Sequence, residues 1–106
     1  MKGKIIEVKQ TCPFPSGRYR RDGQGSAEEF REDVLQPALE AEKSVTLDFS
    51  GIHGVGESFL EETFGGLKRL HGHSQQELIS RLNVIADTDT ERSLIINSIK
   101  NYTKLS

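Results

Sequence analysis

Hydrophobic residues along this 106-residue chain follow two kinds of spacing. Short runs that alternate or are rich in β-branched residues predict strands at 4–9, 45–49 and 82–85. Residues 18–20 are a weaker candidate for a fourth strand that pairs back on the first. Apolar residues three and four apart predict helices near residues 26–42, 58–71, 75–80 and 89–104.

The order of these elements is strand, helix, strand, two helices, strand and helix. Strands that alternate with helices predict an α/β fold with a mostly parallel sheet and right-handed crossovers. Domains commonly contain roughly 100–200 residues. We therefore expect residues 1–106 to form a single small domain, in which three to four strands are flanked by helices.

Capping residues, one proline and a pair of glycines give more detail on where the predicted helices start, bend and pack. A serine or threonine followed three residues later by glutamate is typical of a helix start, and this pattern occurs at Ser26, Ser58 and Thr88. Pro37 should kink its helix or end it early, because proline has no N–H to donate. The pair at 65–66 places two glycines inside a predicted helix, where each costs about 1 kcal/mol relative to alanine. Close packing of this helix against the sheet would explain them, and a surface that a partner approaches closely is the alternative.

Charge, the length of apolar runs and the cysteine count argue against several classes of protein. Fourteen Lys and Arg residues against sixteen Asp and Glu residues give a net charge of -2, whereas nucleic-acid-binding domains are usually basic. No apolar run is long enough to span a bilayer, and the first residues do not resemble a signal peptide. A single cysteine fits a reducing compartment. We expect a cytoplasmic protein that contacts neither nucleic acid nor membrane directly.

Fragments that resemble catalytic signatures are incomplete. The segment 56–60 resembles a nucleophile elbow but lacks its second glycine. The aspartates of segment 87–89 resemble the pair of an aspartyl phosphotransferase, but they more simply favour a helix start. His53, His71 and His73 lack a well-placed further ligand. We expect no enzymatic activity, no cofactor and no metal.

Arg18, Arg20 and Arg21 form the main basic cluster, beside a glycine-rich turn. Their guanidinium groups are able to pair with neighbouring acidic side chains, or to hold a phosphate or the carboxylates of a partner. The second possibility defines an alternative function, a small-ligand or nucleotide sensor that uses the loop from Arg18 to Gly25.

The segment 58–67 (SFLEETFGGL) and the preceding segment 47–51 (LDFSG) are distinctive. With shorter pieces at 17–18, 22–23, 30–31 and 35–37, they resemble the STAS-like domain family of bacteria, which has no settled function. The resemblance extends from about Phe14 to the last helix. It implies a fold similar to the STAS domains of anti-sigma factor antagonists and sulfate transporters. It also implies a non-enzymatic protein-interaction module in signalling.

The resemblance further implies a partner and a modified residue. Anti-sigma factor antagonists carry a serine or threonine where the loop after a central strand meets a helix. A histidine-kinase-like ATPase phosphorylates that residue, and the phosphate stops the antagonist from binding the same kinase. In this chain the acceptor position falls at Glu57 or Ser58. Ser58 is therefore the candidate phosphoacceptor, although a purely structural helix cap also accounts for it.

The predicted fold places loop 50–57 at the carboxyl end of a central strand, where open parallel sheets usually bind ligands. Three glycines make its backbone accessible to a partner. We expect partner contacts to centre on residues 53–62. The candidate contacts are His53, Gly54, Gly56, Glu57, Phe59, Glu61 and Glu62, with Arg18 and Arg20 as secondary contacts.

Overall fold

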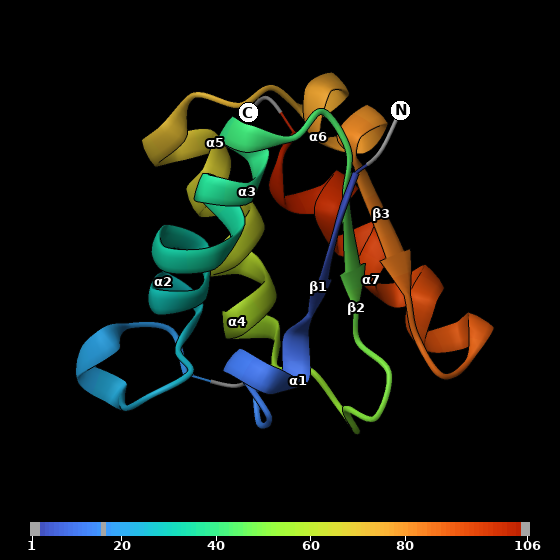
Figure 1. Cartoon of the computed structure of the whole chain (residues 1–106). Helices are drawn as coiled ribbons and strands as arrows, with labels where there is room; N and C mark the ends of the chain where they lie inside the picture. Colours follow the sequence, from blue (N-terminus) through green and yellow to red (C-terminus); the bar gives the residue numbers. More distant parts are fainter. Residues whose placement is uncertain (1–2, 16, 105–106) are drawn as a thin grey trace.

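A computed structural model describes residues 3–15 and 17–104 (Figure 1). Its sheet has three parallel strands in the order β1-β2-β3. The strands are β1 (Lys4–Glu7), β2 (Val45–Asp48) and β3 (Leu82–Ile85). The pairing register aligns Ile6, Leu47 and Val84 in one row across the sheet. The structure confirms the predicted α/β class and the mostly parallel sheet.

The sheet is covered on one face. The side chains of Ile6, Leu47 and Val84 are buried, whereas Ile5 and Ile85 are 64% and 42% exposed. Successive side chains of a strand point to opposite faces, so the exposed residues mark the uncovered side. The helices therefore form a single layer against the other side.

The chain between β1 and β2 differs from the prediction at its start. The first strand ends at Glu7 rather than at residue 9, because the next four residues form a helical turn in which the Cys12 N–H donates to the Val8 carbonyl (2.7 Å). Residues 18–20 are not a strand, and a 3-10 turn begins at Arg20. The elements here are α1 (Val8–Thr11), η1 (Arg20–Asp22), α2 (Ala27–Phe30), η2 (Arg31–Leu35) and α3 (Gln36–Ala41).

The remaining elements lie on either side of β3. They are α4 (Glu57–Leu60), η3 (Glu61–Gly65), α5 (Gly66–His71), α6 (Gln75–Arg81) and α7 (Asp89–Tyr102). Two of the predicted caps are confirmed, because the hydroxyls of Ser26 and Thr88 accept hydrogen bonds from Glu29 N–H and Glu91 N–H, each 3.1 Å long. Ser74 caps α6 in the same way. No helix in the described part of the chain is long and apolar enough to cross a membrane.

Two of the helices contain a π-helical turn. The segments α2, η2 and α3 form one continuous helix, and α4, η3 and α5 form another. The first helix does not end early at Pro37 but continues to Ala41. Its π turn comes just before Pro37, where the missing proline N–H weakens the α-helical hydrogen-bond pattern. π turns are rare and frequently lie at functional sites.

Candidate functional site

The loop between β2 and α4 is held in place by contacts to two other parts of the chain. The Gly51 N–H donates to an Asp87 carboxylate oxygen (3.0 Å), and the Gly56 N–H donates to the Pro15 carbonyl (2.9 Å). Gly54 has a φ of 90°, a conformation that favours glycine. These contacts set the loop at the carboxyl edge of the sheet, with His53 and Gly54 exposed.

An apolar pocket of about 170 Å³ lies between this loop and α7. Its lining includes Phe49, Ile52, Val55, Ala86, Leu94 and Ile95. Leu94 is 49% exposed and also lines a larger, more polar groove of about 610 Å³. That groove follows α7 from Asp89 to Tyr102 and includes Glu57. The loop 50–56, the first turn of α4 and the α7 residues that line the pocket and the groove lie side by side. We call them together the recognition surface.

Glu57 joins α4 to α7 at this surface. The Tyr102 hydroxyl donates a hydrogen bond to a Glu57 carboxylate oxygen, and this bond, together with partial burial, raises the pKa of the tyrosine. The contact fixes the direction of an exposed acidic side chain beside the groove.

Ser58 is exposed but does not cap the helix. The N-cap position is Gly56, and Ser58 is the second residue of α4. The predicted cap with Glu61 is therefore wrong. The Gly56–Pro15 hydrogen bond sets the backbone where the helix begins, and Glu61 instead accepts hydrogen bonds from Arg18 and from Arg69, the latter at 2.5 Å.

Two of the predicted contact residues lie in the interior. Phe59 is 1% exposed and packs against Phe30 with ring centroids 5.8 Å apart. Glu62 is 5% exposed and accepts a hydrogen bond from the buried Arg31. Neither side chain is available to a partner at the surface, so these two predictions are wrong. A glutamate at the margin of an apolar stripe looks exposed in the sequence, because its buried counterion is distant along the chain.

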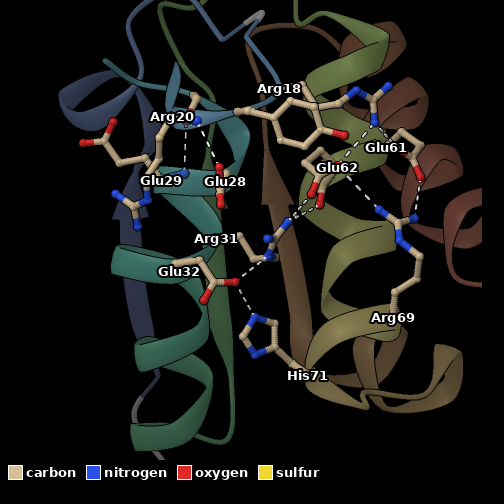
Figure 2. Close-up of polar contacts among 12 residues, drawn as sticks. Arg18, Arg20, Glu28, Glu29, Arg31, Glu32, Glu61, Glu62, Arg69 and His71 are labelled. Atoms are coloured by element: carbon tan, nitrogen blue, oxygen red, sulfur yellow. Dashed lines mark hydrogen bonds and ion pairs between the residues drawn. The ribbon is translucent and has the colours of Figure 1, made fainter. Parts of the chain in front are cut away.

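The arginines of the basic cluster bind different elements, and Figure 2 shows the contacts of Arg18 with Glu61 and Glu62. Arg18 donates to Glu61 and, at 3.4 Å, to Glu62. Arg20 forms two hydrogen bonds with Asp33, 2.8 and 3.0 Å long. The Arg21 guanidinium lies over the ring of Tyr19, 4.9 Å from its centre. The cluster is thus divided among separate partners and does not converge on one ligand.

A buried ionic network lies between the helix formed by α2, η2 and α3 and the helix formed by α4, η3 and α5 (Figure 2). Arg31, 2% exposed, donates to the Glu62 carboxylate (2.8 Å) and to the Glu62 carbonyl (2.7 Å). Its Nε donates to Glu32 (2.9 Å), which also contacts His71 at 2.7 Å. Burial acts to raise the pKa of Glu32, but the hydrogen bonds from His71 and Arg31 outweigh it and hold that pKa below its ordinary value.

The network explains the paired glycines. A Cβ atom on Gly66 would overlap the Arg31 guanidinium, and one on Gly65 would lie 2.6 Å from an Arg69 nitrogen. Gly66 leaves room for the buried Arg31 guanidinium, whereas Gly65 meets only the flexible ends of Arg69 and Glu61. The predicted reason, close packing against the sheet, is wrong. Sequence reasoning missed Arg31, although its position four residues after Ala27 and before Leu35 places it within the apolar stripe.

The histidines do not gather at one site. His53 is exposed on the β2–α4 loop. His71 contacts Glu32, and His73 contacts Glu77 (2.8 Å) and Gln36 (2.7 Å). In residues 3–15 and 17–104 no three His, Cys, Asp or Glu side chains are arranged to hold a metal ion.

Residues 26–92 match the family described as STAS-like domain of unknown function (DUF4325). The match covers more than half of the chain. This chain belongs to the STAS-like domain family. The matched segment of this STAS-like domain contains the β2–α4 loop, Ser58 and both π turns. The chain has no significant match among curated proteins or solved structures.

Proposed function

We propose that this STAS-like domain is a non-enzymatic regulatory module that binds a protein partner through its recognition surface. The observation that carries this proposal is the apolar pocket at the carboxyl edge of the sheet, with the half-exposed Leu94 at its border. Ligands of open parallel sheets bind at this edge. An apolar centre with a polar rim is also typical of protein interfaces, and Glu57 and Asp89 supply such a rim.

The proposed partner is an ATPase of the histidine-kinase-like type, in bacterial cytoplasmic signalling. The resemblance to anti-sigma factor antagonists supports this choice. In those proteins the interaction is controlled at the junction that Ser58 occupies here. The surface has an apolar pocket beside a groove that Glu57 and Asp89 line, so a partner that inserts an apolar side chain fits it.

Phosphorylation of Ser58 is the proposed means of control. The residue is exposed in the first turn of α4. A phosphate adds nearly two negative charges at neutral pH. Beside Glu57, this charge would weaken the docking of a partner surface selected to fit the unmodified domain.

A binding experiment with matched variants tests the surface. The domain is used to isolate an ATP-binding partner, and the affinity is then measured by calorimetry for Leu94→Glu and for Leu70→Glu. Leu70 is 64% exposed on α5 and does not line the pocket. We expect Leu94→Glu to weaken binding at least about tenfold, which corresponds to about 1.4 kcal/mol, and Leu70→Glu to bind like the unaltered chain. Failure to obtain an ATP-binding partner, or equal affinities for both variants, would contradict the proposal.

The same measurement tests control at Ser58. Ser58→Asp should weaken binding through its charge, whereas Ser58→Ala should retain it. If Ser58→Asp binds as tightly as the unaltered chain, charge at this position does not control the interaction.

A further inference from the structure

We propose that Arg18 binds the phosphate of a phosphorylated Ser58 and leaves Glu61 to do so. This inference rests on the phosphorylation of Ser58 under the proposed function. It assigns a second residue to the switch, from a segment far from Ser58 in the sequence.

The geometry of α4 places Ser58 within the reach of Arg18. The Glu61 N–H bonds the carbonyls of Glu57 and Ser58, so the backbone from Ser58 to Glu61 is helical. With 3.6 residues per turn, Ser58 lies about 60° to one side of Glu61 and about 40° to the other side of Glu62. It precedes them by about 4.5–6 Å along the axis.

Arg18 bonds both of these glutamates. Its Nη1 donates to Glu61 and, at 3.4 Å, to Glu62. Figure 2 shows the guanidinium reaching the carboxylates of both residues. Because Ser58 lies between the two in angle and one turn before them, a phosphate on that serine would lie about one helical turn from the residues whose carboxylates Arg18 binds.

The exchange of partners leaves neither glutamate without a cation. Glu61 keeps its hydrogen bond from Arg69 (2.5 Å), and Glu62 keeps Arg31 at 2.8 Å. Arg69 also lies 3.5 Å from Glu62. The network therefore lacks the large penalty of a buried charge that loses its only partner.

The phosphate is the stronger ligand for the released arginine. A phosphoserine carries three acceptor oxygens and nearly two negative charges, which an arginine fork binds bidentately. The side chain of Arg18 is 31% exposed, so it has room to turn on its solvent side.

The modification itself transfers the γ-phosphoryl group of ATP: the Ser58 Oγ–P bond forms, the P–O bond to ADP breaks, and the serine proton leaves to solvent.

The consequence is a change in the N-terminal segment. Arg18 lies between Pro15, which bonds the β2–α4 loop, and η1. When the Arg18 guanidinium moves from Glu61 to a phosphate on Ser58, the segment between Pro15 and η1 is held at the start of α4. Its ionic contact then lies closer to the recognition surface. The modification thereby alters a second part of that surface besides Ser58.

The test is the phosphate titration of the full chain carrying phosphoserine at position 58, followed by phosphorus NMR. The second pKa of phosphoserine is ordinarily about 6. A bound arginine favours the dianion, so Arg18→Gln should raise this pKa by about half a unit or more, a threefold change in the protonation equilibrium. Arg20→Gln is the matched control, because Arg20 binds Asp33, and it should leave the titration unchanged.

Two further variants keep the result decisive. Glu61→Gln weakens the competing ligand of Arg18 and should shift the titration toward a lower pKa. Arg18→Lys retains the charge without the fork and should fall between arginine and glutamine at this position. The inference fails if Arg18→Gln shifts the titration no more than Arg20→Gln, or if the Arg18→Lys and Arg18→Gln chains titrate alike. No partner protein is needed, so this result is independent of the binding test of the proposed function.

Discussion

Arg31 and Glu62 join the two π turns of the domain. Arg31 is the first residue of η2, and Glu62 is the second residue of η3. A single nitrogen, Nη1 of Arg31, bonds both the carboxylate and the backbone carbonyl of Glu62. Both side chains are buried, and the space for the guanidinium exists because Gly66 has no side chain. The pair therefore fixes how the two long helices lie against each other.

Loss of Arg31 should destabilise the domain strongly. Arg31→Met leaves Glu62 buried with weaker partners, and removal of one member of a buried pair typically costs about 3–5 kcal/mol. Urea denaturation measures this loss. Arg20→Gln is the control, since it removes an exposed ion pair with Asp33 and should leave the denaturation midpoint unchanged. The double variant Arg31→Met, Glu62→Leu should recover much of the stability, and a loss below about 1 kcal/mol for Arg31→Met would show that the pair is dispensable.

The two adjacent glycines should respond differently to alanine. Gly66→Ala places a methyl group against the buried Arg31 guanidinium, so it should destabilise the domain despite the better helix propensity of alanine. Gly65→Ala meets the flexible ends of Arg69 and Glu61 and should be much better tolerated. Thermal unfolding of both variants checks this order. Equal melting temperatures would contradict the assignment of Gly66 as the space for Arg31.

Serine caps should be distinguishable from the exposed Ser58. Ser26→Ala removes a hydroxyl that accepts the Glu29 N–H and should lower the free energy of unfolding by about 1 kcal/mol. Ser58→Ala removes an exposed hydroxyl from the second residue of α4 and should change it by less than about 0.5 kcal/mol. Chemical denaturation compares the two. A loss at Ser58 as large as that at Ser26 would mean that its hydroxyl supports the helix start.

Stability should fall in acid partly through Glu61. Partial burial acts to raise its pKa, but the hydrogen bonds from Arg18 and Arg69 outweigh this effect and hold the pKa below its ordinary value. The resulting stabilisation is complete above the unfolded-state pKa of about 4.3 and is lost as the pH falls through the lower folded-state pKa. Urea denaturation at a series of pH values should show a flatter acid limb for Glu61→Gln. Identical acid limbs would exclude this contribution.

Cys12 should be unreactive in the folded domain. Burial raises the pKa of its thiol to about 12, and the nearby Glu29 carboxylate acts in the same direction. The thiolate is the reactive form, so alkylation by iodoacetamide at about pH 8 should be very slow until the chain is unfolded. Mass spectrometry follows the reaction with and without urea. Rapid alkylation of the native chain would contradict the burial of this side chain.

The sequence by itself determined the order of the three strands and the longer helices, and two of the helix caps, but not α1 and η1. Val45 and Leu47 point to the same face because a strand repeats every two residues, and Ser26 caps its helix through a residue three positions away. Such signals lie within a few residues, so they are visible without the fold. The family resemblance at residues 58–67 rests on the same kind of local pattern, and the family match confirms it.

Only the tertiary structure decided the contacts of the charged side chains and the shape of the recognition surface. Glu62 lies in the interior because its carboxylate is paired with Arg31, which lies 31 positions earlier in the chain. Arg18 donates to Glu61, which lies 43 positions later. Ser58 is not a cap because the helix already begins at Gly56, whose carbonyl accepts the Leu60 N–H and whose N–H donates to the distant Pro15. A local pattern records the polarity of a residue but not the partner that folding brings to it. Whether a charge is buried or exposed therefore depends on segments that the parallel crossovers place side by side.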